Sequence, residues 1–289
     1  MRFAVDIPNI GTFGGDGNDF ADPHFVAELA HEAEEAGWDG FFIWDHIGAD
    51  WPVALADPWV LLAAVALRTS SIKLGPMVTP LPRRRPWKLA REAITLDHLS
   101  HGRLILGVGI GGGTEYTCFH EVGDDRTHGE MLDEGLSVLQ GLWSGEPFSY
   151  AGTHYQVTNA HFLPRPVQPH IPIWVAGIWP NKKPFRRAAR WDGVFPLGKA
   201  LTFTQQMTPE RIHEVSEYVQ AHRPPTSETS PYDLAHWGIT TGDDPDADRT
   251  LVASYAAVGV TWWMENFNNE RGPIEAQRAR IRQGPPRLD

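Results

Sequence analysis

The sequence predicts an α/β fold in which eight parallel strands, each followed by a helix, close into a (β/α)8 barrel. Strand-like and helix-like segments alternate along almost all of the 289 residues. The strand segments are short, nearly continuous apolar runs, which is the pattern of strands covered on both faces. The length suits a single barrel of this kind, which needs roughly 250 residues. No linker is visible, so we expect one domain over residues 1–289.

The first half of the chain contains four strand–helix units. Asp22 and Pro23 have the pattern of a helix start, and Gly37 that of a helix end. A glycine-rich loop separates the fourth strand from its helix. In order, the predicted segments are strand 3–7, helix 23–36, strand 40–44, helix 58–67, strand 72–78, helix 86–99, strand 104–108 and helix 128–143.

An insertion at about residues 145–171 interrupts the alternation. Within it, residues 148–162 are expected to form a hairpin outside the barrel, closed near the sequence AGTH. The alternation then resumes, and eight units in sequence favour a closed barrel over an open doubly wound sheet. The remaining segments are strand 173–176, helix 185–189, strand 193–195, helix 209–221, strand 234–239, helix 246–257, strand 260–265 and helix 273–283.

Composition and charge narrow the classes of partner. The chain has 36 acidic and 25 basic residues and a net charge of −11. This argues against nucleic acid or an anionic membrane, because both bind basic surfaces. A single cysteine, Cys118, allows no internal disulfide and no thiolate metal cluster. The start lacks a signal-peptide pattern, and the longest apolar run, around residues 59–67, is too short to cross a bilayer. We expect a cytoplasmic protein that acts on a small molecule.

The segment GFFIWDH, residues 40–46, provides the first candidates for catalysis. A buried strand here places Asp45 and His46 at its carboxyl end, the edge where barrels of this class carry their ligand sites. An acid and an imidazole at that edge are suited to proton transfer. Alternatively, Asp45 caps the next turn and His46 packs against its neighbours. The residues alone leave both interpretations open.

Glycines and cations near other strand ends suggest a bound cofactor. The segment GVGIGG, residues 107–112, fits GxGxxG, but it lies in the fourth unit and no helix follows at once. Its glycines bring the backbone close to a flat ring or to a neighbouring segment. After the fifth strand, free amides of residues 177–179 lie near Lys182 and Lys183, which suits an anionic group. A basic outer helix face also explains the lysines. The arginines at 83–85 either hold an anion or form a solvated turn.

Strand ends also carry the carboxylates Asp6, Asp45 and Glu265, so a barrel hydrolase with paired carboxylates is another possibility. The spacings HxH and HExxH are absent, and we expect no metal site. Several of the 12 tryptophans lie in or just after strands, where they line an aromatic pocket or fill the core: Trp44, Trp174, Trp179, Trp262 and Trp263.

Four longer segments together resemble the luciferase-like flavin and deazaflavin oxidoreductases, over nearly the full chain. They are AEEAGWDGFFIWDH, LGPMVTPLPRRRPWKLAREAITLDHLSHGRLILGVGIG, EGLSVLQGLWSGEPFSYAGTHYQV, and PRPVQPHIPIWVAG together with AARWDGVFP. The resemblance implies a barrel with an inserted region. It also implies a flavin-type ring at the carboxyl ends of the strands, and a cofactor phosphate beside the loop after the fifth strand.

The resemblance places Asp45 and His46 against the reactive edge of that ring. It implies a bulge behind the ring at Met77–Val78, where the family often has a non-prolyl cis peptide. The Asp-His ending favours coenzyme F-420, because flavin monooxygenases of the family more often show a Glu-His-His type of ending. FMN is the alternative cofactor. The cofactor-binding residues expected in addition are Val108, Gly109, Ala176, Gly177, Ile178, Trp179, Lys182 and Lys183.

The chain departs from the family's deazaflavin sugar-phosphate dehydrogenases at the fourth strand. These carry a glutamate directly after the strand's glycine, whereas this chain has IGGG there and Glu115 only later. We expect a homodimeric oxidoreductase that uses F-420 for hydride transfer to or from a small organic substrate, with His46 handling the proton and Asp45 orienting it. An FMN-dependent monooxygenase is the alternative. A non-catalytic flavin-binding protein and a barrel hydrolase are alternatives of other classes.

Overall fold

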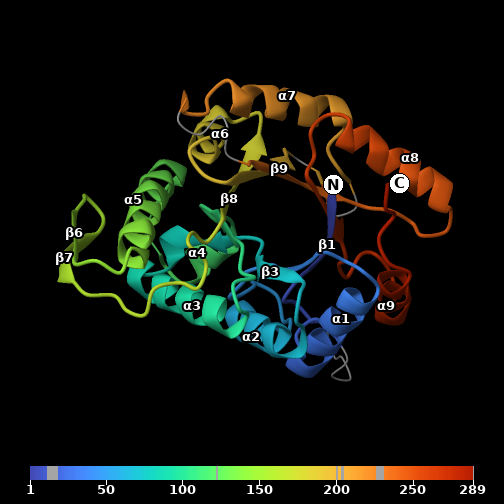
Figure 1. Cartoon of the computed structure of the whole chain (residues 1–289), viewed down its shortest axis with the longest axis horizontal. Coiled ribbons are helices and arrows are strands. Elements are labelled where there is room, and N and C mark those ends of the chain that lie inside the picture. Colours follow the sequence, from blue (N-terminus) through green and yellow to red (C-terminus); the bar gives the residue numbers. More distant parts are fainter. Residues whose placement is uncertain (12–18, 122, 200, 203–204, 226–230, 289) are drawn as a thin grey trace.

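Parallel strands form a nearly closed barrel surrounded by helices (Figure 1). The computed structural model describes residues 1–11, 19–121, 123–199, 201–202, 205–225 and 231–288. The sheet order is β3-β2-β1-β11-β10-β9-β8-β5-β4. Its strands are β1 (Arg2–Ile7), β2 (Gly40–Ile43), β3 (Lys73–Pro76), β4 (Thr79–Pro80), β5 (Leu106–Gly109), β8 (Ile173–Trp179), β9 (Gly193–Gly198), β10 (Asp233–Gly238) and β11 (Trp262–Asn266).

The barrel closes because β3 and β4 are consecutive pieces of one strand, so nine labelled strands make eight barrel positions. β3 pairs with β2, and β4 pairs with β5. A parallel bridge between Leu74 of β3 and Leu104, which lies just before β5, places β3 beside β5 as well. Gly75 permits this approach, because a Cβ atom there would collide with the carbonyl oxygen of Ile105. The two pieces are separated at Met77–Val78, whose peptide bond is cis, as the resemblance implies.

Helices cover the outside of the barrel, and the predicted alternation is confirmed. Asp22 and Asp57 cap the first two helices, because their carboxylates accept hydrogen bonds from the first free backbone N–H groups. One short helix, α4, was not predicted. The helices are α1 (Pro23–Glu35), α2 (Pro58–Arg68), α3 (Pro86–Leu99), α4 (Thr114–Cys118), α5 (Asp125–Trp143), α6 (Lys182–Ala188), α7 (Pro209–Gln220), α8 (Pro245–Ala256) and α9 (Ile274–Arg282), with a 3-10 turn η1 (Leu81–Arg83).

The predicted insertion is an antiparallel hairpin, β6 (Phe148–Ala151) and β7 (Gln156–Ala160), which lies beside α5 and away from the barrel (Figure 1). Glu134 of α5 accepts hydrogen bonds from the backbone N–H groups of residues 153–155 and so fixes the hairpin turn. No helix in the described part of the chain is long and apolar enough to cross a membrane.

Two apolar layers position the strand ends. The larger layer lies between the strands and the helices, and the smaller one fills the inside of the barrel. Trp174, Trp262 and Phe42 are buried together in the inner layer, with ring centroids 5.3–6.0 Å apart. Because these rings fill the barrel interior, a ligand has room only at the carboxyl ends of the strands.

Candidate active site

A cavity of about 490 Å3 lies at the carboxyl ends of the strands. Residues at the ends of β1, β2, β5, β8, β9 and β10 line it, together with the Met77–Val78 bulge. The volume is in the usual range for sites that bury a small organic ligand. The lining includes many of the residues expected from the sequence: Asp45, His46, Met77, Val78, Gly109, Ala176, Gly177 and Ile178.

Four residues expected at the cofactor do not line this cavity. Val108 packs in the layer between strands and helices. Trp179 points away, and its indole N–H donates to Glu214 at 3.1 Å. Lys182 holds its ammonium 3.4 Å from the centre of the Trp179 ring, and Lys183 is exposed. The basic outer helix face weighed above therefore describes these lysines better than an anion site.

The expectation that the backbone amides of residues 177–179 are free also needs correction. β8 runs three residues further than predicted, and its pairing with β9 continues to Trp179 and Gly198. This segment is therefore part of the sheet rather than a loop. On its other side, the pairing of β8 with β5 ends at Val175. Just beyond that point, Gly109 and Gly177 line the cavity.

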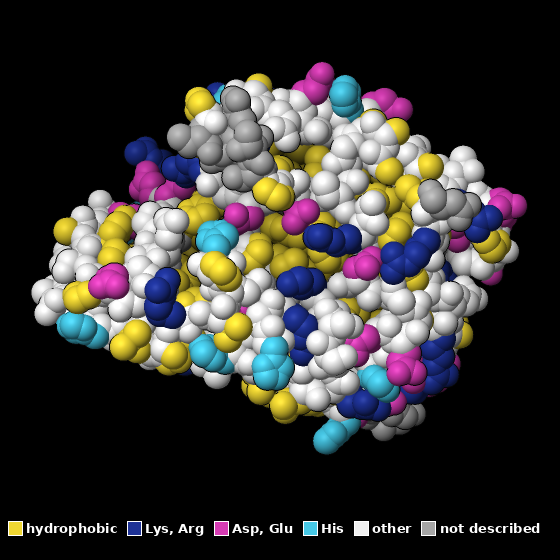
Figure 2. Space-filling model, viewed as in Figure 1, with side chains coloured by type: hydrophobic (Ala, Val, Ile, Leu, Met, Phe, Trp, Pro, Cys, Tyr) yellow, Lys and Arg dark blue, Asp and Glu magenta, His cyan; other side chains and the backbone are white. Residues whose placement is uncertain are grey.

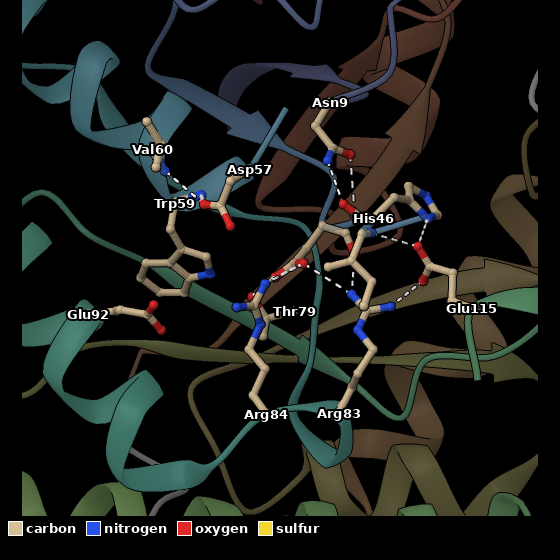
Figure 3. Close-up of polar contacts among 12 residues, drawn as sticks. Asn9, His46, Asp57, Trp59, Val60, Thr79, Arg83, Arg84, Glu92 and Glu115 are labelled. Carbon is tan, nitrogen blue, oxygen red and sulfur yellow. Dashed lines mark hydrogen bonds and ion pairs between the residues drawn. The ribbon is translucent and has the colours of Figure 1, made fainter. Parts of the chain in front are cut away.

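His46 is fixed from two sides (Figure 3). The side-chain amide of Asn9 donates to the carbonyl oxygen of His46 at 2.7 Å, and its oxygen accepts from the His46 amide at 3.2 Å. The ring nitrogen Nδ1 lies 3.2 Å from Oε1 of Glu115. The side chain is 40% exposed and lines the cavity.

Glu115 is an ionised acceptor in this arrangement. Burial, the largest single influence, raises its pKa, but hydrogen bonds from His46 and Ile47 and the positive charge of Arg83 together lower the pKa to about 2. Its Oε1 accepts from the Ile47 amide at 2.8 Å, and Oε2 is paired with Arg83. A carboxylate only accepts hydrogen bonds, so Nδ1 of His46 carries the proton. In the neutral ring, Nε2 is then the free base.

Asp45 does not orient His46, contrary to the expectation. Its carboxylate is completely buried, and the hydrogen bonds found for it come from residues other than His46. Arg84 Nη2 donates to both of its oxygens, at 2.7 and 2.8 Å, and Thr79 donates to Oδ2 at 2.7 Å. Arg83 binds its Oδ1 at 3.2 Å. The carboxylate in contact with the His46 ring is therefore that of Glu115, whereas Asp45 holds the end of β2 through the two arginines.

Of the three arginines at 83–85, Arg83 and Arg84 are accordingly not solvated, whereas Arg85 is exposed. The Arg83 side chain is 2% exposed and joins the carboxylates of Asp45 and Glu115 (Figure 3). Two interpretations of these arginines followed from the sequence, and both involved partners outside the protein, either an anionic ligand or water. The actual partners of Arg83 are carboxylates of this chain.

Glu115 reaches His46 because the glycine-rich loop folds back. Gly111 and Gly113 have φ values of 71° and 70°, a region that favours glycine. The loop ends in the short helix α4, in which Tyr116 donates to the carbonyl oxygen of Ile110 at 2.7 Å. The position of Glu115 could not be read from spacing, because it depends on these backbone angles.

The glycines of the same loop differ in how closely they are packed. A Cβ atom on Gly109 would lie 3.0 Å from Val78, so a side chain there would press on the bulge. A Cβ atom on Gly112 would meet nothing within 4 Å, so that glycine borders open space. Gly109 therefore packs closely against Val78 at the wall of the cavity, whereas Gly112 leaves the backbone open toward the space beside it.

An aromatic wall forms another side of the cavity. The Trp44 and Trp237 rings meet edge to face with centroids 5.8 Å apart, and Trp44 lies 6.0 Å from the His46 ring. Behind them, Asp6 Oδ2 accepts from the Trp44 indole at 2.9 Å. Burial raises the pKa of Asp6 to about 8, so this carboxyl is neutral at pH 7. Trp44 was among the tryptophans weighed for an aromatic pocket, whereas Trp237 was missed.

Comparisons with known proteins agree with this architecture. An uncharacterized protein of Mycobacterium tuberculosis is 40% identical over 134 residues, 46% of this chain and 47% of that protein. An F-420-dependent glucose-6-phosphate dehydrogenase of Nakamurella multipartita is 34% identical over 166 residues, 55% of this chain and 48% of that enzyme. These matches span about half the length of the curated relatives.

A solved structure shares the fold over almost its whole length. The coenzyme F-420 dependent tetrahydromethanopterin reductase from Methanopyrus kandleri superposes with a TM-score of 0.75, at 17% identity, over 97% of this chain and 96% of that one. The family model described as luciferase-like monooxygenase matches residues 1–284. The chain therefore belongs to the luciferase-like monooxygenase family.

Proposed function

We propose that the protein is an F-420-dependent oxidoreductase that transfers hydride to or from a small organic substrate. The observation that carries the proposal is the His46–Glu115 pair, which presents a fixed imidazole to a cavity lined by glycines and an aromatic wall. The Asp-His ending of β2 and the similarity to curated F-420-dependent dehydrogenases support this cofactor.

The cofactor ring would lie in the cavity beside Val78, Gly109 and Gly112, which line it. When bound, a reduced deazaflavin supplies a hydride from its C5 position. The charged cofactor tail would extend from the cavity to the exposed rim. Charges at the rim stay hydrated and do not require a buried cation.

His46 would transfer the proton that balances the hydride. Reduction of a ketone or aldehyde forms one C–H bond from the hydride and one O–H bond from a proton, which the protonated imidazole donates. For this role the ring must keep one orientation in both protonation states. The ionised Glu115 accepts from Nδ1–H in both states, so Nε2 is the atom that gains or loses the proton.

The other function classes have less support. For a hydrolase with paired carboxylates, the Asp45 carboxylate is already bound by two arginines. Glu265 binds Thr240, Trp263 and Arg271 and does not line the cavity. The FMN-dependent monooxygenase stays the main alternative, because the lining of the cavity does not distinguish the two rings. A non-catalytic flavin-binding protein would not need the fixed imidazole.

Steady-state turnover tests the proposal. Reduced F-420 is mixed with the protein and a panel of aldehydes, ketones and imines, and its reoxidation is followed without oxygen. A parallel reaction contains reduced FMN and oxygen. We expect turnover in the first reaction, strongly reduced by His46→Ala. Turnover in the second reaction alone would establish the monooxygenase instead. No turnover in either, with intact cofactor binding, would favour the non-catalytic protein.

A further inference from the structure

The Arg83 guanidinium is a buried cation that lies next to the His46–Glu115 pair but outside the cavity. Figure 2 shows hydrophobic side chains gathered in a hollow near the centre of the face, with charged side chains at its edge. Arg83 lies beneath this surface, since its side chain is 2% exposed, and it is not among the described residues that line the cavity. Because Arg83 does not touch a ligand in the cavity, it acts on the reaction only through its charge and its neighbours.

Arg83 divides its hydrogen bonds between two segments. Nη1 is paired with Oε2 of Glu115, and Nη2 donates to the carbonyl oxygen of Asp45 at 3.0 Å and to its Oδ1 at 3.2 Å. The other oxygen of Glu115, Oε1, accepts from the Ile47 amide at 2.8 Å and lies 3.2 Å from Nδ1 of His46. The Glu115 carboxylate therefore lies between a guanidinium that is always charged and an imidazole that is charged only when protonated.

The charges of this cluster balance when the His46 ring is neutral. The carboxylates of Asp45 and Glu115 face the guanidinium groups of Arg83 and Arg84. Without the charge of Arg83, two carboxylates would face one guanidinium, a net charge of −1, and a proton on the imidazole would restore neutrality. A carboxylate within about 4–6 Å favours the charged form of an imidazole, and burial strengthens the attraction. Without Arg83, Glu115 would therefore hold His46 in its protonated form.

The other ionisable groups on the elements around this ring are neutral at pH 7, exposed or occupied by other partners. Asp6 of β1 and Tyr116 of α4 are neutral, because burial raises the pKa of Asp6 to about 8 and raises that of Tyr116 well above its usual range. Asp125 at the start of α5 is exposed. Asp57 caps α2, and Arg187 of α6 is held in a salt bridge to α5. Within the described residues, the charge in contact with the ring is thus that of the carboxylate paired with the buried guanidinium.

We propose that Arg83 is a positioning residue that leaves His46 free to gain and release a proton, because it compensates the charge of Glu115. The inference rests on the proposed function in taking His46 as the proton-transfer group. Arg83 keeps the Glu115 carboxylate at Nδ1 without turning the contact into a permanent ion pair with the imidazole. The opposite nitrogen, Nε2, then carries the proton that the reaction consumes or produces.

Histidine NMR on the cofactor-free protein tests the proposal without turnover. The histidine rings are isotope-labelled, the His46 signals are identified by their absence in His46→Ala, and their chemical shifts are followed from about pH 5 to pH 9. Arg83→Met should move the midpoint of the His46 titration upward by at least about one pH unit, a tenfold change in proton affinity. Arg83→Lys keeps the charge and should leave the midpoint unchanged. An unchanged or lowered midpoint in Arg83→Met would overturn the proposal.

Further variants show whether the charge of Glu115 is the one that Arg83 compensates. Arg84→Met is the matched control, because Arg84 binds Asp45, whose carboxylate has its described hydrogen bonds with groups other than the ring. It should move the midpoint by less than half as much as Arg83→Met, and equal shifts would overturn the special role of Arg83. Adding Glu115→Gln to Arg83→Met removes both charges and should return the midpoint toward that of the wild type.

A full upward shift that persists in this double variant would also overturn the proposal. If Arg83→Met does not fold, Arg83→Gln takes its place. It lacks the charge but keeps an N–H donor for Glu115, and the same upward shift is expected.

Steady-state kinetics connect the titration to the reaction. In ketone reduction with reduced F-420 the protonated imidazole donates the proton, so kcat should fall as the pH rises through the His46 midpoint. Arg83→Met should move that fall to higher pH by the same amount as the NMR midpoint, with cofactor affinity unchanged. A shifted midpoint with an unmoved kcat profile would contradict the part assigned to Arg83. Failure of the proposed function appears instead as absence of F-420 turnover in the wild type, whereas the NMR titration needs no cofactor, so the two failures are distinguishable.

Discussion

Replacing Glu115 by glutamine tests the role assigned to the His46 pair. The substitution keeps the shape of the side chain but removes the charge that accepts from Nδ1 of His46 and pairs with Arg83. The amide can also present its NH2 group to the imidazole, which allows the opposite tautomer. We expect kcat to fall by about 10 to 100-fold, while the affinity for cofactor changes little, because a base with the wrong tautomer loses its proton-transfer function.

The same variant has a defined effect on stability. The pKa of Glu115 is lowered from 4.5 to about 2, so its ionised form stabilises the fold. That stability is fully present above about pH 4.5 and is lost as the pH falls through 2. The difference corresponds to about 3 kcal/mol at pH 7. Glu115→Gln should therefore be less stable than the wild type at pH 7 by about this amount, and the gap should close toward pH 2.

Urea unfolding and steady-state kinetics at several pH values check both expectations on the same preparations. Glu121→Gln is the control, since Glu121 is exposed on the same segment. A stability loss with unchanged kcat would mean that Glu115 is only structural. That result would refute the assignment of Glu115 as the residue that orients His46.

Three further outcomes follow from single residues. His46→Ala should lower kcat by about 10² to 10⁴-fold with little effect on cofactor affinity. If kcat and cofactor affinity fell by the same factor, His46 would have a binding role instead. Burial lowers the pKa of His236 from 6.5 to about 3, and neither ring nitrogen has a partner among the described residues. The unfolded chain therefore binds an extra proton below pH 6.5, so between pH 7 and pH 5 the wild type should lose about 2 kcal/mol more stability than His236→Phe in urea unfolding. Asp6 should ionise near pH 8 beside the Trp44 indole, and a tryptophan-fluorescence transition at that pH should be absent in Asp6→Asn; the same transition in both proteins would exclude Asp6 as its source.

The barrel could be predicted from the sequence because each strand is a short apolar run and each helix carries its own start signal. Asp22 and Asp57 were identifiable as capping residues by their position before Pro23 and Pro58. The location of His46 followed from the same pattern, since the end of a buried strand fixes where the next side chain lies.

The partners in the site could not be predicted, because they depend on backbone geometry between elements. Glu115 reaches His46 through a loop whose glycines adopt positive φ angles, and no spacing rule encodes that path. Lys182 was expected near an anion on account of its distance along the chain from β8. In the fold it turns toward the rings of Trp179 and Tyr218, an attraction that the sequence pattern does not show.

Equilibrium titration with the two cofactors tests the central claim most directly. Oxidised F-420 and FMN are each added to the purified protein, and binding is followed by the change in their fluorescence at low and moderate ionic strength. A Lys182→Ala, Lys183→Ala double variant is titrated in parallel, and because these side chains lie off the cavity, its affinity should match that of the wild type. We expect F-420 to bind at least about tenfold more tightly than FMN. Tighter binding of FMN, or binding of neither cofactor, would contradict the assignment of this protein as an F-420-dependent oxidoreductase.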